Sequence, residues 1–212
     1  MVFCNEPYPM PNTKTMDGAT LLGTGLIVGI ACHFAAAALV HKAPKDFIYL
    51  IMLIERLIVV YAVVVGLWLG WLQKSWWRAA LGAALGIAAW LCCQAARVSS
   101  PGSWLPVMIF LPPLLGGTLA VLVGSGRHAG LRLVRGLVAG AMFTFVYGGI
   151  LLVAGMDMLV PAIADAPIPV FEAKFAVYVH EIGPLAMAVA SMLFFPLIRR
   201  AALPDSIKRY GD

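Results

Sequence analysis

The sequence predicts an all-α integral membrane protein, a bundle of six transmembrane helices joined by short loops. Of its 212 residues, 62% are apolar and only 12% are charged, and the mean hydropathy is +0.92. Soluble domains carry about 25% charged residues, so this composition indicates a chain embedded in lipid. The second observation is length: about 20 apolar residues cross a hydrocarbon core about 30 Å thick, and six stretches reach that length.

The six predicted spans form one domain over residues 19–198. In order they are Ala19–Val40, Phe47–Leu72, Ala79–Arg97, Trp104–Val123, Leu131–Gly155 and Glu172–Ile198. No connection is long enough to fold by itself. The longest, residues 156–171, is expected to be either a proline-containing loop that makes the outer mouth acidic or an amphipathic cover on the membrane surface. Residues 1–18 lack the basic start and apolar centre of a secretory signal, so the first span is expected to direct membrane insertion.

The distribution of Lys and Arg predicts that both termini lie in the cytoplasm. Ten of the 15 basic residues fall on the side of the termini, four fall on the opposite side, and Arg56 lies inside a span. Because basic residues are retained on the cytoplasmic side, we expect an inner-membrane protein with a cytoplasmic segment 1–18 and a cytoplasmic basic tail 199–212. The net charge of +5 then reflects topology and contact with anionic lipids, whereas nucleic-acid binding needs a solvated basic face.

The first, third and fifth spans each contain two glycines four residues apart. They are Gly25 and Gly29, Gly82 and Gly86, and Gly136 and Gly140. Small residues at this spacing let helix backbones approach closely in lipid, so these faces are candidates for contacts within the bundle, in a homo-oligomer or in a larger complex. His33 follows Gly29 by four residues and should face another helix. The recurrence also suggests a helical hairpin repeated three times.

Five ionisable residues of the first, second and sixth spans fall about 10 to 14 Å below the predicted outer boundary, counted at 1.5 Å per residue. They are His33, Glu55, Arg56, His180 and Glu181. A lone charge in lipid costs several kcal/mol, so we expect one shared buried layer. Because Glu55 and Arg56 point about 100° apart, Arg56 is expected to pair with Glu181. Glu55 is then matched by His33 or His180, or is protonated, since burial raises the pKa of a carboxyl group.

Three prolines are expected to kink the helices beside this layer. Pro112 and Pro113 lie in the fourth span, and Pro184 follows Glu181 by three residues in the sixth. Proline removes a helical hydrogen bond and frees a carbonyl group that can serve a cavity, a water molecule or a cation. The alternative interpretation is a kink that serves packing alone.

The function predicted from this layer is a small transporter or channel-like protein that moves a proton, a cation or a small solute. Glu55 would titrate, Arg56 and Glu181 would form a fixed pair, and His33 and His180 would be relay or substrate contacts. Interhelical polar contacts in membranes are worth only about 1 kcal/mol each, and five ionisable groups exceed what a purely structural contact needs. The alternative function is a non-catalytic structural or assembly subunit of a larger membrane complex.

A membrane enzyme is the third interpretation. The sequence has no nucleotide-binding loop, no Ser/His/Asp set, no HExxH motif and no CxxC pair. His33 and His180 could serve as the axial ligands of one b-type haem, because ring nitrogens from two helices can meet the iron from opposite sides. No other cofactor and no metal site is predicted, and the expected partners are the lipid bilayer and the transported ion or solute.

Overall fold

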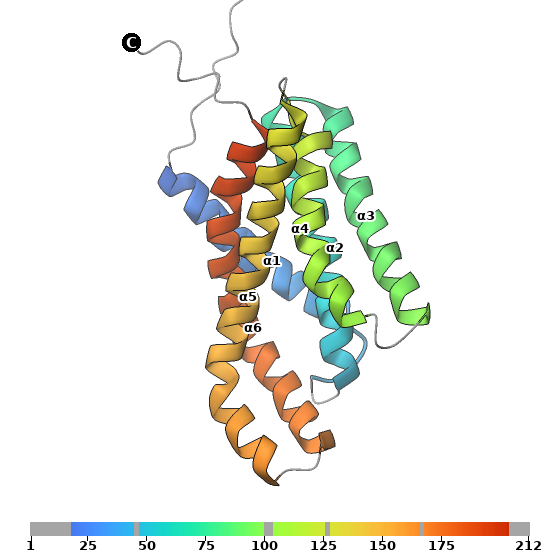
Figure 1. Ribbon diagram of the computed structural model, residues 1–212, viewed down its shortest axis with the longest axis vertical. Helices are drawn as coiled ribbons and strands as arrows, with labels where there is room; N and C mark the ends of the chain where they lie inside the picture. Colours follow the sequence, from blue (N-terminus) through green and yellow to red (C-terminus); the bar gives the residue numbers. More distant parts are fainter. Residues whose placement is uncertain (1–17, 45–46, 100–103, 126–127, 166–167, 204–212) are drawn as a thin grey trace, which may run out of the picture.

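A computed structural model describes residues 18–44, 47–99, 104–125, 128–165 and 168–203. Within these ranges every regular element is an α-helix and no strand occurs, which confirms the predicted all-α bundle. The helices are α1 (Gly18–Ala38), α2 (Phe47–Leu72), α3 (Trp76–Ser99), α4 (Trp104–Leu122), α5 (Ala129–Asp165) and α6 (Ile168–Ala202) (Figure 1). Most run roughly side by side, and α1 crosses the others obliquely (Figure 1).

Five of the described helices contain stretches long and apolar enough to cross a membrane. These stretches are Gly18–Ala38, Ile48–Leu72, Trp76–Ala95, Ala129–Gly155 and Lys174–Ala202. The remaining helix, α4, has 19 residues. Large apolar side chains such as Phe145 and Val153 are strongly exposed on the outside of the bundle, as lipid-facing residues are. Length and composition therefore support a multi-pass membrane protein.

The α5–α6 hairpin extends beyond the other helices at the end where α1 ends and α2 begins, which we name the α1–α2 end (Figure 1). The helices contain 37 and 35 residues, or about 55 and 52 Å at 1.5 Å per residue. The expectation of a loop over residues 156–171 was wrong, because α5 continues to Asp165 and α6 begins at Ile168. Pro169 lies in the first turn of α6. Its missing N–H group costs no hydrogen bond there, because the N–H groups of the first turn have no partner within the helix.

The three glycine pairs make close helix contacts inside the bundle. Gly25 and Gly29 of α1 lie on the backbone of Ser191 and Met187 in α6. In the same way, Gly82 of α3 meets Gly66 of α2, and Gly136 and Gly140 of α5 meet Gly116 and Pro112 of α4. A Cβ atom at any of these glycines would overlap the neighbouring helix. The glycine faces are therefore occupied by contacts within the fold.

The glycine contacts do not form the three equivalent hairpins that the sequence suggested. The α2–α3 and α4–α5 contacts join consecutive helices, but the third contact joins α1 to α6, the first helix to the last. The glycine spacing shows that a helix has a close partner, and long-range packing decides which helix that partner is.

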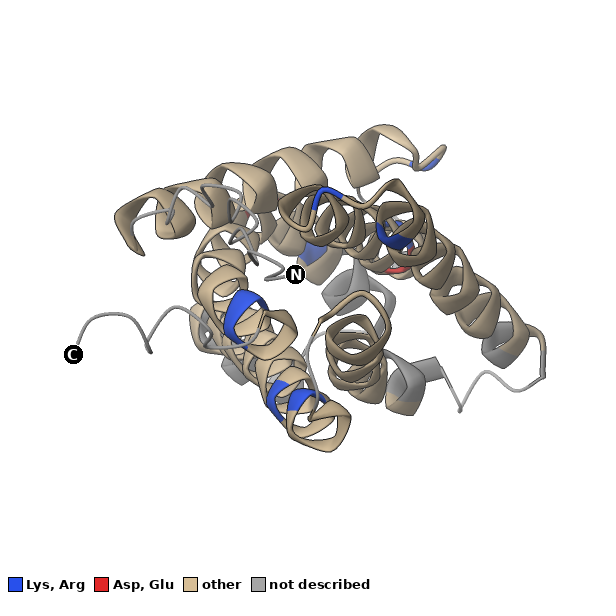
Figure 2. Ribbon diagram, turned by 90° about the horizontal axis from the view of Figure 1, so that it is seen from above, with Lys and Arg blue, Asp and Glu red and all other residues tan. Residues whose placement is uncertain are grey.

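Basic residues gather at the opposite end of the bundle, where α2 ends and α3 begins. This α2–α3 end carries the following basic residues on or beside the helix ends: Lys74, Arg78, Arg132, Arg135, Arg199 and Arg200. Figure 2, seen from this end, shows blue segments spread over several helices. The described residues of this end include no Asp or Glu.

Candidate functional site

The structure does not bring the five predicted site residues together. His33 of α1 and His180 of α6 meet where α1, α2 and α6 pack together. Glu55 and Arg56 of α2 instead contact side chains of α3. Glu181 is exposed on the surface of α6.

The two histidines form a cluster with Tyr49 of α2. Their ring centroids lie 6.5 Å apart, and the Tyr49 hydroxyl shares a 2.6 Å hydrogen bond with Nδ1 of His180. His33 is 0% exposed, and neither of its ring nitrogens has a hydrogen-bond partner among the described residues. A buried polar group left without a partner costs about 1–3 kcal/mol, so the position of His33 is unusual for a residue that serves packing alone.

Gly183 makes room for the ring of His33. A Cβ atom at this position would overlap Cε1 of His33. Because Gly183 follows His180 by three residues, both lie on the same face of α6 and both meet α1. Sequence reasoning missed Tyr49 and Gly183, although the i, i+3 spacing of His180 and Gly183 was a usable signal for a close contact on that face.

Two buried hydroxyl groups lie further along the same interface. Ser191 of α6 is fully buried, and its Oγ lies 2.7 Å from the position that a Cβ atom of Gly29 would take. The hydroxyl of Tyr61 in α2 approaches Ser191, but neither oxygen makes a hydrogen bond of ordinary geometry. Ser191 follows His180 by 11 residues, or about 16 Å along α6, about half the hydrocarbon thickness. We name Tyr49, His180, His33, Ser191 and Tyr61 the polar file.

The acidic and basic residues of α2 are held by α3. Glu55 is 1% exposed, and its Oε2 accepts a 2.9 Å hydrogen bond from Nε2 of Gln94. The guanidinium carbon of Arg56 lies 5.5 Å from the ring centroid of Trp90, a cation–π contact. The expected pairs, Arg56 with Glu181 and Glu55 with a histidine, were therefore wrong. Trp90 and Gln94 are four residues apart on α3, so together they reach two consecutive residues of α2.

The expected single polar layer was also wrong. Tyr49 is the third residue of α2, so its bond to His180 places that histidine close to the α1–α2 end. Glu55 follows Tyr49 by six residues and lies about 9 Å further along α2. The prediction counted depth on α6 from a boundary near residue 172. Because α6 extends beyond the start of α2, His180 lies instead at the level of the first turn of α2.

The three prolines also lie in two places. Pro184 lies inside α6 and directly follows Gly183. Pro112 and Pro113 lie inside α4, where the carbonyl oxygen of Pro112 contacts Gly140 of α5. Pro112 lines an apolar pocket and not the histidine cluster, so the expectation that all three prolines line one site was wrong.

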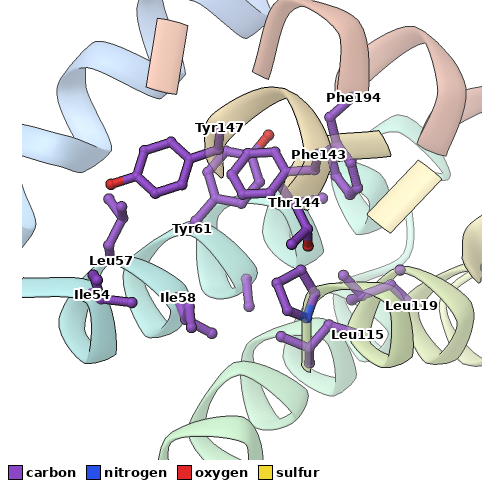
Figure 3. A pocket seen from close by; sticks show the side chains of 14 residues that line it. Ile54, Leu57, Ile58, Tyr61, Leu115, Leu119, Phe143, Thr144, Tyr147 and Phe194 are labelled. Carbon is purple, nitrogen blue, oxygen red and sulfur yellow. The ribbon is translucent and has the colours of Figure 1, made fainter. Parts of the chain in front are cut away.

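This pocket, which sequence reasoning missed, lies mainly between α2, α4 and α5 and has a cavity volume of about 90 Å³. On one side the ring of Phe143 stacks on the ring of Tyr61, with 4.9 Å between centroids. The ring of Tyr147 lies nearly parallel to that of Phe143, with 6.1 Å between their centroids (Figure 3). Its lining is almost entirely carbon, so it is no path for an ion. We name it the α2–α4 pocket, and it is lined by Ile54, Leu57, Ile58, Tyr61, Ala62, Val65, Pro112, Leu115, Gly116, Leu119, Phe143, Thr144, Tyr147 and Phe194.

The histidine pair does not fit a haem. The backbones of α1 and α6 touch at Gly29, and the ring of His33 fills the space in front of Gly183. A porphyrin between the two rings would need these helices to separate. For other metals, the described residues contain no group of three or more His, Cys, Asp or Glu side chains that could hold an ion.

Comparisons of the chain with protein-family models, with curated proteins and with solved structures gave no match. Its function is therefore inferred from the chemistry of its own residues. Two features stand out: the polar file between α1, α2 and α6, and the apolar α2–α4 pocket.

Proposed function

We propose that the protein moves protons across its membrane through the polar file, as a proton channel or as a proton-coupled transporter. The observation that supports this proposal is His33, which is fully buried beside a second histidine and whose ring nitrogens have no hydrogen-bond partner within the described part of the chain. Imidazole is the side chain that gains and loses a proton near neutral pH. A purely structural histidine would be held by fixed hydrogen bonds, whereas a relay histidine must be able to exchange its partners.

Each group of the polar file can both donate and accept a hydrogen bond, which proton transfer along a chain requires. Tyr49 and His180 begin the file near the α1–α2 end, His33 follows, and Ser191 and Tyr61 lie deeper. The two rings are 6.5 Å apart between centroids, so transfer between them needs a ring rotation or a bridging water molecule. The tightly packed glycine contacts on either side favour a proton over a larger cation or solute.

The remaining ionisable residues take different roles in this proposal. Glu181 is exposed beside His180, where a carboxylate can collect protons from the membrane surface. Glu55 and Arg56 fasten α2 to α3 through Gln94 and Trp90, so their role is structural.

Proton flux into proteoliposomes, followed with an enclosed pH-sensitive dye under an imposed membrane potential, tests the proposal. His33→Gln should assemble normally and lose the flux, because an amide cannot take up and release a proton in the neutral pH range. His41→Gln is the matched control, since His41 is exposed outside the helices, and it should conduct like the unaltered protein. Absence of flux in the unaltered protein, or full flux in His33→Gln, would contradict the proposal.

A second candidate, a subunit of a larger membrane complex, is favoured by Glu181. This carboxylate is exposed on a predominantly apolar helix, where a basic group of another protein could pair with it. Purification in a mild detergent distinguishes the candidates: a partner that copurifies with the unaltered protein and is lost in Glu181→Gln favours the subunit. A discrete particle made of this chain alone favours transport.

A further inference from the structure

We propose that the α2–α4 pocket binds the end of a hydrocarbon chain of a membrane lipid. This inference does not depend on proton transfer. It rests on the lining of the pocket, on its size and on the side from which it opens.

The surface of the pocket that a ligand would contact consists almost entirely of carbon atoms. Thr144 contributes a hydroxyl group, but its Oγ1 donates a 3.2 Å hydrogen bond to the carbonyl oxygen of Gly140 in its own helix. The hydroxyl of Tyr61 approaches Ser191, on the side of the polar file. A charged or strongly polar solute would lose its hydration here without compensation, so the chemistry selects an apolar occupant.

The size of the pocket selects a slender occupant. Its volume of about 90 Å³ is smaller than the roughly 150 Å³ of a protein cavity known to hold benzene. A ring-shaped headgroup or a whole lipid is too large for it. The end of a chain fits, because the rest of the molecule can remain outside a pocket that is open at one side.

The exposure of the lining residues shows where the pocket opens. Val65 of α2 and Leu119 of α4 are 0% and 2% exposed and form its closed part. Ile58 of α2 and Leu115 of α4 are partly exposed and pack beside Ala89 and Cys93 of α3, so we place the mouth on the side where α3 and α4 meet.

The surface beside this mouth is apolar. On α4 it continues into the exposed side chains of Ile109, Phe110 and Leu114. In a membrane such a surface faces acyl chains, so the molecules that reach the mouth are lipids. An empty pocket would leave its wall atoms without dispersion contacts, and an inserted chain end supplies them.

Photo-cross-linking in vesicles tests this assignment. The vesicles consist of phosphatidylcholine that carries a diazirine near the methyl end of one acyl chain, and the cross-linked residues are mapped by mass spectrometry. In the unaltered protein we expect cross-links to Val65 and Leu119, although both are buried. Leu69 of α2, equally buried but outside the pocket, should stay unlabelled and defines the background.

Two substitutions on the same turn of α4 make a matched pair. Leu115→Trp fills the pocket and should remove most of the labelling of Val65 and Leu119. Leu114→Trp adds the same side chain at the neighbouring position, which is 56% exposed and outside the pocket, and should leave the labelling unchanged. Ala62→Leu fills the pocket from α2 and serves in place of Leu115→Trp if that variant does not fold.

Labelling of Val65 and Leu119 at the level of Leu69 would overturn the assignment, as would equal labelling in Leu115→Trp and Leu114→Trp. A lipid with the diazirine beside its headgroup provides a check that needs no variant. If the chain end is what enters, this second probe should leave Leu119 at the level of Leu69, and labelling of Leu119 by both probes would contradict the proposed orientation.

Discussion

Among single residues, the contact between His33 and Gly183 shows that the polar file depends on the missing side chain of a glycine. The ring of His33 occupies the space that a Cβ atom at Gly183 would need. The histidine is therefore positioned by close packing and not by hydrogen bonds to its ring. This arrangement fixes the place of the imidazole while leaving both nitrogens able to exchange a proton.

Gly183→Ala should displace the ring of His33 and destabilise the protein by about 1–3 kcal/mol, the usual cost of overpacking. Gly148→Ala is the control, because nothing lies within 4 Å of a Cβ atom at that helical position. There the change should be neutral or stabilise the helix by up to about 1 kcal/mol. Unfolding of both variants in detergent measures the difference, and equal stabilities would show that Gly183 is not a tight contact.

Glu55→Gln distinguishes the structural role from the titrating role that the sequence suggested. Gln keeps an oxygen that can accept the hydrogen bond from Gln94, so assembly and proton flux should both be close to those of the unaltered protein. Flux in proteoliposomes and elution from a sizing column are the measurements. Normal assembly combined with lost flux would restore Glu55 as the titrating group.

At the scale of elements, helix α3 satisfies two consecutive residues of α2 that point in different directions. Trp90 lies under the guanidinium of Arg56, and Gln94 donates to Glu55. Because both contacts come from one face of α3, they hold the register of the α2–α3 pair in addition to the close glycine contact between Gly66 and Gly82.

A double-mutant cycle on Arg56→Met and Trp90→Leu should show a coupling energy of about 0.5–2 kcal/mol, the range of cation–π contacts. The same cycle on Arg56→Met and Glu181→Gln should be additive, since Arg56 stacks on α3 and Glu181 is exposed on α6. Thermal unfolding in detergent supplies the energies. Coupling between Arg56 and Glu181 would instead support the ion pair expected from the sequence.

At the scale of the whole molecule, the two ends of the bundle differ in charge and in shape. The α2–α3 end carries the clustered basic residues, and the α5–α6 hairpin extends beyond the opposite end. Retention of basic residues in the cytoplasm predicts that the α2–α3 end faces inward and that the hairpin faces outward.

Labelling of single cysteines with a membrane-impermeant reagent tests this orientation. Cysteines introduced within residues 157–170 should react from outside the cell, and those within residues 125–130 should react only after the membrane is made permeable. The reverse pattern would place the entrance of the polar file on the cytoplasmic side.

Composition and the length of the apolar stretches were enough to predict an all-α bundle with helices able to cross a membrane, because both are properties of each segment alone. The sequence also identified the glycines of close helix contacts and His33 as a residue that faces another helix, since both follow from helical periodicity. The folded molecule was needed to show that α1 meets α6, that Tyr49 binds His180 and that Glu55 and Arg56 contact α3. The sequence could not predict these contacts because counting depth along each helix assumes that all helices begin at the same level. The extension of α6 beyond α2 removes that common level, and packing between distant segments selects the polar groups that meet.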